Sequence, residues 1–404
     1  MVRAVISCVL VLVVSLPAWA ANWNQGSGSD TGPKKTTTRM HSWGPVRNVP
    51  VTTYVPSGAI KRDLSLKIWS PKIDDIKTCW KSTYNPHKKS EFDQIVFGYR
   101  WPNLMNGASK FNEDNLNMLN HIIQLTASPN GDSYAKEKAS KAAGLLKKRL
   151  LNAAKESAFT RVKWDKKVGS SPSFVTALTV KTTAFVIAGL ESMGLLSKKE
   201  FNQIEEWVLK LLGNIAKTKM GNGKLSPDHM VAVFSTHILY GAASKNRELF
   251  DIGKKEFESY LKKRSISGIG DKVRNDNETM HHAIIAAEIL ELNGVPAYDF
   301  KLKDGNFEEA VSRHATNILD LGSAEVKTQG DPKDKARSIL RKTGFGTHVA
   351  WIPIYLSRHK NSPSAQSVLK LHQVLEKRDP KPYFGLQIGL HTGCYFGGAI
   401  NYST

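Results

Sequence analysis

The sequence has few cysteines, few acidic residues and, after its first twenty positions, no long apolar run. Only 3 of its 404 residues are cysteine, and Cys8 lies in the N-terminal apolar segment. The chain holds no Cys-x-x-Cys, His-Glu-x-x-His or Asp-rich calcium loop, so we expect neither a metal ion nor another cofactor. Beyond the first twenty residues no run of about twenty uninterrupted apolar residues occurs, so we expect no membrane span.

Acidic residues are outnumbered by basic ones. The chain has 57 Lys and Arg against 36 Asp and Glu, a formal net charge of +21 at pH 7. A field of this sign attracts polyanions and speeds their capture within roughly a Debye length, about 8 Å at physiological salt. Nucleic acid, anionic membranes and acidic polysaccharides are the partners of this kind. The export signal described next argues against nucleic acid.

The first twenty residues predict a secretory signal peptide. Arg3 precedes an apolar run over residues 4–16, and small residues follow at Ala18 and Ala20. Signal peptidase cuts such a segment, here after Ala20, and the run is too short to span a membrane. We therefore expect a periplasmic or secreted protein, with residues 21–404 as the mature chain.

The mature chain divides into an arm and one large domain. Residues 21–70 are rich in Gly, Ser, Thr, Pro and Lys and predict an extended N-terminal arm, with one short strand over residues 49–55. Residues 71–404 predict a single domain that ends in a glycine-rich, aromatic tail at 385–398. The remaining cysteines, Cys79 and Cys394, either join the arm to the tail in a disulfide or stay as two separate thiols.

Helical periodicity dominates the middle of the chain and indicates an all-α protein. Ser197 followed by Glu200 forms a capping box at the start of one helix. Most connections are short, and several helices are apolar on more than one face, which favours paired inner and outer helices. Because no repeat of about 30–40 residues is present, we favour an incomplete α/α toroid over a solenoid. Helices are predicted over residues 112–126, 133–157, 173–193, 197–217, 226–243, 246–264, 277–293, 307–321, 348–359 and 362–376.

Two predicted helix starts carry ionisable groups. Ser226 is a suitable N-cap and Pro227 suits the first helical position, so Asp228 and His229 fall in the first turn. Unpaired backbone N–H groups there favour bound anions. A helix N-terminus also lowers the pKa of a histidine, so His229 is expected to be neutral near pH 7.

The second helix start contains an arginine and two histidines. Arg274 and His281 are seven residues apart, which is two helical turns, and they share one face if the helix already includes Arg274. His282 follows directly, and adjacent helical residues point about 100° apart. The two segments therefore predict a site that handles anions with histidine and arginine.

Several stretches together carry a resemblance. They are residues 173–214, the run Asp228-His-Met-Val-Ala-Val-Phe, the run Asn246-Arg-Glu-Leu-Phe-Asp251, and Arg274 with His281-His282. This arrangement resembles the alginate lyase family, typified by periplasmic poly(mannuronate) lyases. Residues 351–358, Trp-Ile-Pro-Ile-Tyr-Leu-Ser-Arg, are similar to the last inner helix of that family.

Two positions differ from the motifs of that family. There an Asn-Asn-His motif opens an inner helix, and an Arg precedes a catalytic Tyr by seven residues, with a His after the Tyr. In this chain Asp228 stands at the Asn next to the His, and His281 stands at the Tyr. An ionised Asp228 would repel a uronate, and His281 would replace a phenol as the base.

The resemblance implies an incomplete α/α toroid and cleavage of an anionic, uronate-containing polysaccharide by β-elimination. Such a reaction needs a neutralised C6 carboxylate, a base for the C5 proton and an acid for the departing O4. Arg274 can bind a carboxylate bidentately, His229 can share that task, and His281 can move protons. The expected catalytic residues are therefore His229, Arg274 and His281, and the protein is expected to act as a monomer.

Further residues are expected to bind the substrate. Asp228 and His282 flank the catalytic histidines, and Tyr240 is eleven residues after His229, on the same helical face. Trp101 and Trp351 are candidates for stacking on sugar rings. Two other functions remain open: a non-catalytic relative that binds anionic glycan, or a glycoside hydrolase on an α/α toroid. A hydrolase needs two carboxylates, and Asp228 with Glu278 is the obvious pair.

Overall fold

The structure is a computed structural model, and it describes residues 54–56, 58–69, 105–126, 133–160, 172–215, 227–266, 273–323 and 349–377. Within these ranges the chain is mostly helical and contains no strand, in agreement with the all-α prediction. Residues 54 and 55, the described end of the predicted strand, are not in a strand. The predicted signal peptide, both cysteines of the mature chain and the glycine-rich tail lie outside the described residues.

The helices follow one another through the chain with short connections where these are described. Their bounds are α3 Met105–Thr126, α4 Ser133–Lys155, α5 Pro172–Ser192, α6 Lys198–Ile215, α7 Pro227–Ala243, α8 Arg247–Leu261, α9 Val273–Leu292, α10 Phe307–Ser323, α12 Trp351–His359 and α13 Gln366–Glu376, with short 3-10 turns η3 at Ala297–Asp299 and η5 at Pro363–Ala365.

The observed helix ends agree with the predicted ones to within a few residues in most cases. The capping box is present, since the Ser197 N–H donates to Glu200 Oε2 at 2.9 Å and the Glu200 N–H donates to Ser197 Oγ at 3.3 Å. Three starts differ by four or more residues, because α3 begins at Met105, α9 at Val273 and α13 at Gln366. The earlier start of α9 brings Arg274 into the helix, so its backbone lies on the same face as that of His281.

The helices fall into two classes by burial. All residues of α7 are buried, which follows from a sequence with no charged side chain after Asp228 other than histidine. In α8 the buried residues Leu249, Phe250, Phe257 and Tyr260 recur at helical spacing on one face. Helices of the first class therefore lie inside the molecule, and those of the second class cover them.

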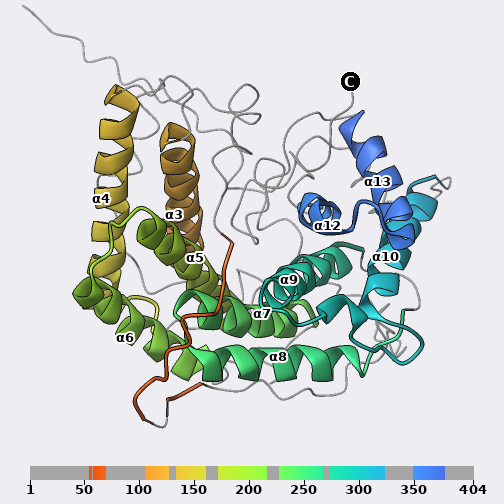
Figure 1. Ribbon diagram of the computed structural model, residues 1–404, viewed down its shortest axis with the longest axis horizontal. Helices are drawn as coiled ribbons and strands as arrows, with labels where there is room; N and C mark the ends of the chain where they lie inside the picture. Colours follow the sequence, from red (N-terminus) through yellow and green to blue (C-terminus); the bar gives the residue numbers. More distant parts are fainter. Residues whose placement is uncertain are drawn as a thin grey trace, which may run out of the picture.

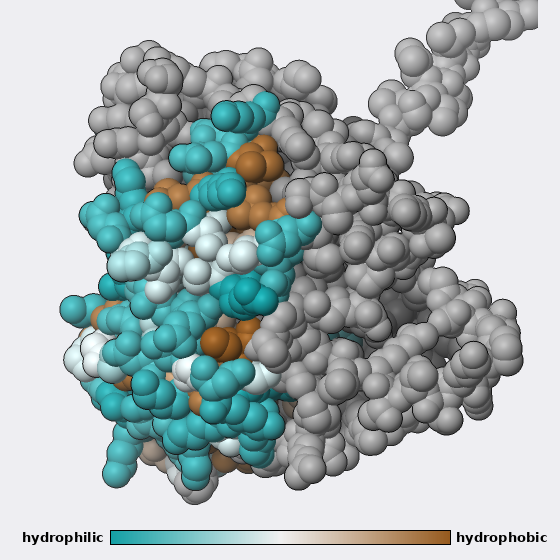
Figure 2. Space-filling view, turned by 90° about the vertical axis from the view of Figure 1, so that its right-hand side faces the viewer, coloured by the Kyte–Doolittle hydropathy of each residue, from teal (hydrophilic) through white to brown (hydrophobic). Residues whose placement is uncertain are grey.

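The contacts between helices show how the buried helices and the covering helices are arranged. Helix α3 packs against α5, α5 against α7, α7 against α9 and α9 against α12, while α4, α6 and α8 pack against α3, α5 and α7 respectively. In Figure 1 the helices form an open arc, from α3 and α4 at the left, through α7 and α8 at the bottom, to α10 and α13 at the right. On the side where α10 and α13 lie, the coloured surface is mostly hydrophilic with small separate apolar areas (Figure 2).

Among the described residues one helix, Ser173–Ser192, is long and apolar enough to cross a membrane by length and composition alone. In the structure 89% of its most apolar window is buried among other helices. This is the environment of a core helix, and α5 fills that place between α3 and α7.

Helices α7 and α8 cross at close range because each has a glycine at the contact. A Cβ atom on Gly241 would lie 2.6 Å from the backbone nitrogen of Phe250, and one on Gly253 would lie 2.7 Å from that of Ile238. No side chain fits in either gap, so the two glycines set the spacing between the buried helix and its cover.

Part of the predicted N-terminal arm crosses the helices as a strap, which we define as residues 54–56 and 58–69. Arg62 pairs with Glu205 of α6 through both guanidinium Nη atoms and donates to the Ser244 carbonyl at 2.6 Å. The Trp69 ring stacks on Phe185 of α5, with ring centroids 6.1 Å apart. The strap therefore contacts α5, α6 and the residue after α7, which all lie far from it in the sequence.

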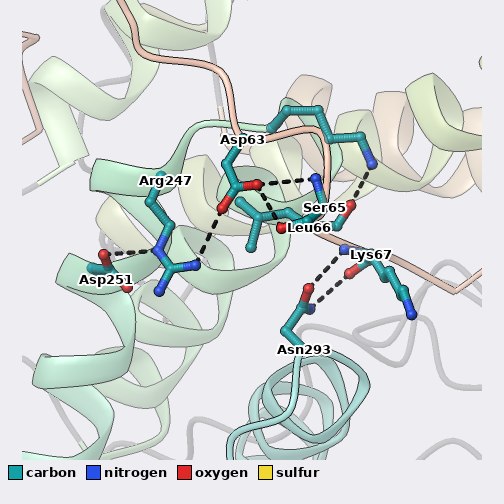
Figure 3. A network of polar contacts seen from close by, with 8 residues as sticks. Asp63, Ser65, Leu66, Lys67, Arg247, Asp251 and Asn293 are labelled. Atoms are coloured by element: carbon teal, nitrogen blue, oxygen red, sulfur yellow. Dashed lines mark hydrogen bonds and ion pairs between the residues drawn. The ribbon is translucent and has the colours of Figure 1, made fainter.

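Figure 3 shows the polar contacts in the middle of the strap. Asp63 accepts a hydrogen bond from Arg247 Nη1 at 3.2 Å, and Arg247 also contacts Asp251 of its own helix at 3.0 Å. The Lys67 N–H donates to Asn293 Oδ1 at 2.7 Å, and Asn293 Nδ2 returns a bond to the Lys67 carbonyl at 2.9 Å. Because these partners follow the ends of α7 and α9, the strap lies at the C-terminal ends of the buried helices.

Candidate functional site

Residues of three helices meet at the candidate site: histidines from α7 and α9, and Phe174 from α5. The ring of Phe174, in the first turn of α5, stacks on His229 in the first turn of α7, with centroids 4.4 Å apart and planes at 27°. The same Phe174 ring meets His282 of α9 edge-on, with centroids 5.8 Å apart. Phe174 thus lies against both histidines, and the two segments predicted to share a site do lie close together.

His229 is buried, with 6% of its surface exposed. Burial lowers its pKa from 6.5, and the neighbouring Asp228 acts in the opposite direction. The predicted direction of the pKa change is therefore correct, but its main cause is removal from water, whereas the prediction rested on the helix terminus. A neutral imidazole at this place can donate one hydrogen bond and accept a proton.

Asp228 is buried beside His229. Its Oδ2 lies 3.8 Å from His229 Nε2, and its Oδ1 has no hydrogen-bond partner among the described residues. A buried carboxylate oxygen without a donor is costly, which makes this position a candidate for contact with a substrate hydroxyl. Its charge also favours the protonated form of His229.

His282 is fully buried and contacts a lysine. Its Nδ1 lies 2.6 Å from Lys181 Nζ of α5, and its Nε2 has no hydrogen-bond partner within the described part of the chain. Burial lowers the pKa of His282 well below 6.5, and the charges of Lys181, His281 and His229 lower it further. His282 is consequently a neutral imidazole, close enough to the other two histidines to sense their charge.

His281 is also buried, with 1% of its surface exposed. The sequence predicts that at most one of His281 and His282 faces the site directly. The structure keeps both in the interior, and the contacts with Lys181 and Phe174 are made by His282. Asn277, one helical turn before His281, contacts His314 of α10 and Trp351 of α12, so that face of α9 adjoins the later helices.

Lys181 is a member of the cluster that no sequence motif predicts. It is 1% exposed, and burial lowers its pKa from 10.5 to about 7. A signal was available, because Lys181 is the single charged residue between positions 172 and 190. A charge in the middle of so apolar a helix is expensive and marks a position with a specific role.

Two predicted substrate-binding residues have other surroundings. Tyr240 lies three turns along α7 from His229, about 16 Å at 1.5 Å per residue, at the end of the helix near the strap. Burial raises its pKa well above 10, and the charges that act on it are those of Glu205, Arg62 and Glu191. A shared helical face does not bring residues three turns apart together, so Tyr240 lies away from His229 along α7, and its role in substrate binding stays a prediction.

Trp351 is a packed core residue. It is fully buried, and its indole N–H donates to Asn277 Oδ1 at 3.3 Å. A platform for sugar rings needs an exposed face, which Trp351 does not have here, so sugar stacking by Trp351 stays a prediction that its burial does not favour. Its contact with Asn277 instead braces α9 one turn before His281.

The remaining predicted residues are described in part or lie elsewhere. The backbone of Arg274 lies in the first turn of α9, while its side chain is outside the described atoms. Trp101 lies outside the described residues. Within the described ranges no group of three or more His, Cys, Asp and Glu side chains is placed to hold a metal ion.

The arrangement offers neutral imidazoles next to one buried cationic centre. The neutral imidazole of His229 can accept a proton, and the ammonium of Lys181 makes the surroundings favourable for negative charge. These are the requirements for moving a proton next to an anionic group. Compared with protein-family models and with curated proteins, the sequence gives no match.

Proposed function

We propose that this protein is a polysaccharide lyase that cleaves an anionic, uronate-containing polysaccharide of the alginate type by β-elimination. The observation that carries the proposal is that His229 of α7 and His282 of α9 lie against the same Phe174 ring, while Lys181 of α5 contacts His282. His281 is the residue next to His282 in α9. A buried cluster of cationic and neutral nitrogen groups suits a substrate whose reacting sugar carries a carboxylate. The excess of basic residues in the whole chain, at +21, suits the capture of a polyanion.

The proposed fold is an incomplete α/α toroid. The row α3, α5, α7, α9 and α12, with α4, α6 and α8 packed against it, supports this architecture. The open arc in Figure 1 supports it as well. In such an arrangement the N-terminal ends of the buried helices form one rim, where histidines from α7 and α9 meet.

The proposed chemistry follows from the groups at this rim. Arg274 and His229 bind the C6 carboxylate of the uronate, which makes the C5 proton more acidic. His281 removes that proton; the electron pair of the C5–H bond forms the C4=C5 double bond, and the C4–O4 bond breaks. The departing O4 takes a proton from an acid, and the protonated His281 can supply it.

The negative charge of an ionised Asp228 would repel the carboxylate of a uronate. The residue is 4% exposed and lies next to His229, so its charge is partly offset whenever His229 is protonated. We propose that Asp228 holds the orientation of the His229 ring and accepts a hydrogen bond from the sugar. Export through a signal peptide would place the enzyme in the periplasm or outside the cell, where polyuronates occur as substrates.

The proposal is tested by incubating the mature chain with alginate and other polyuronates while following ultraviolet absorbance and reducing ends together. A lyase raises both signals, because each cleavage creates a conjugated C4=C5 double bond and a new end. Reducing ends without absorbance would indicate a hydrolase, and binding without either signal would indicate a non-catalytic glycan-binding protein.

Variants then connect the activity to the site. His229→Ala and Arg274→Ala are each expected to abolish turnover while the unfolding transition persists. His372→Gln is the matched control, since this histidine lies in α13, outside the cluster. Normal turnover in either of the first two variants would remove that residue from the mechanism.

A further inference from the structure

Lys181 has an unusual environment for a charged residue. Its ammonium is buried in an otherwise uncharged stretch of α5, and no carboxylate pairs with it among the described residues. A buried ammonium without a counter-charge costs several kcal/mol unless another group compensates it. Its one hydrogen-bonding contact in the described structure is to His282 Nδ1 at 2.6 Å, so any role of Lys181 acts through that ring.

The contact sets the protonation of the His282 ring. An ammonium group has three hydrogens to donate and no acceptor, so Nδ1 must accept the bond. A neutral imidazole that accepts at Nδ1 carries its proton on Nε2. A doubly protonated ring is excluded as long as Lys181 is charged, because two positive charges would then lie 2.6 Å apart.

The other nitrogen of the ring is available. Nε2 of His282 is buried and has no hydrogen-bond partner among the described residues. The ring itself is held from the side by the edge-on contact with Phe174, which also stacks on His229. A buried N–H group without an acceptor is unfavourable. This one lies next to His229, which the proposed mechanism places at the substrate carboxylate, and that carboxylate can accept the hydrogen bond.

We propose that Lys181 is a positioning residue for His282: its ammonium holds Nδ1 as an acceptor, so that the neutral ring presents Nε2–H as a donor to the uronate carboxylate. This inference rests on the proposed lyase function for its substrate. His282 then stabilises the negative charge that builds up on the C6 carboxylate as the C5 proton leaves, without taking part in proton transfer. The neighbouring charged or titratable groups are Asp228 and His229 of α7 and His281 of α9.

The first test measures the tautomer directly and needs no substrate. In protein with ¹⁵N-labelled histidine, long-range nitrogen–proton spectra distinguish a protonated ring nitrogen from a bare one, and His282→Gln identifies the signals of His282. We expect a proton on Nε2, a bare Nδ1 and no protonation of the ring between about pH 5 and 7, where an ordinary histidine titrates. A proton on Nδ1, or an ordinary titration, would overturn the proposal.

The second test removes the ammonium. Lys181→Met keeps a long side chain in an apolar helix, so the fold should persist, while Lys181→Arg keeps a cationic donor. We expect kcat on the polyuronate to fall about 10- to 100-fold in Lys181→Met, the range seen when a partner that orients an active imidazole is lost. Lys181→Arg should recover part of this loss, and the His282 spectrum of Lys181→Met should show a mixed or titrating ring.

The controls separate this inference from the lyase proposal. Lys210→Met removes an exposed lysine that pairs with Glu206 on α6, and it should change neither the spectrum nor kcat. If Lys181→Met keeps both the His282 tautomer and the wild-type kcat, the positioning role is refuted while the lyase function stands. If the wild type cleaves no polyuronate, the proposed lyase function is refuted. The proposed hydrogen bond from His282 Nε2–H to a uronate carboxylate is then refuted as well, whichever tautomer of His282 is observed.

Discussion

Replacing Lys181 by methionine is expected to make the protein more stable near neutral pH. Burial lowers the pKa of Lys181 from 10.5 to about 7. At about 1.4 kcal/mol for each unit of pKa, keeping this charge in the folded state costs about 5 kcal/mol. Methionine avoids that cost but leaves Nδ1 of His282 without its donor, a loss of about 1–3 kcal/mol. The expected gain in the free energy of unfolding is therefore about 2–4 kcal/mol at pH 7.

The gain should depend on pH in a defined direction. The unfolded chain binds more protons than the folded one between about pH 7 and pH 10.5, so the wild type becomes more stable as the pH rises through this window. The variant lacks this dependence. Its advantage should be full below about pH 7, shrink as the pH rises, and reverse before about pH 10.5, where Lys181 is neutral in both states and only the lost hydrogen bond to His282 remains.

Urea unfolding of both proteins across this pH window measures the effect, with the slope against urea as a check that the same surface is exposed. A Lys181→Met variant that is less stable than the wild type at pH 7 would refute the reasoning. So would a difference in stability that stays constant between about pH 7 and pH 10, because the lowered pKa would then not be the cause. Loss of activity together with a gain in stability would show that the charge is kept for function.

Two further perturbations test the packing and the strap. Gly241→Ala should destabilise the fold by about 1–3 kcal/mol in urea unfolding, since its Cβ would lie 2.6 Å from the Phe250 backbone. The control Gly144→Ala, whose Cβ would meet nothing within 4 Å, should be neutral or stabilising. Arg62→Met removes the cation that pairs with the buried Glu205 and should lower the free energy of unfolding by about 1.5–3 kcal/mol. The same change at the exposed Arg247 should lower it by under about 1 kcal/mol. Equal losses of stability in the two glycine variants, or in the two arginine variants, would contradict this reasoning.

Much of the fold is predictable because it depends on local patterns. The buried helix α7 and its amphipathic cover α8 differ in where polar side chains occur, and the sequence alone shows that difference. The capping box of Ser197 with Glu200 predicts the start of α6 from two residues. The ends that differ lack such signals, as at α9, where the helix extends four residues before the predicted start at Asn277.

The site was predictable to the extent that it depends on helix starts. His229 and Arg274 stand in first turns, and α7 and α9 are neighbours, so the two motifs approach each other. The partner on the third helix was not predictable from helix starts, because Lys181 lies in the middle of α5. The available signal was its isolation as the single charged residue between positions 172 and 190, and the structure shows that it is buried. Tyr240 shares a helical face with His229 but lies three turns further along α7, because periodicity gives the face of a residue and not its position along the helix axis.

The central claim is that the protein breaks a uronate polymer by elimination, and cleavage in ¹⁸O-labelled water tests it most directly. Elimination takes up no water, so mass spectrometry of the products formed from alginate or another polyuronate should show unsaturated ends and no ¹⁸O derived from the cleavage step. Saturated products that carry one ¹⁸O atom, or the absence of products from every polyuronate, would contradict the account.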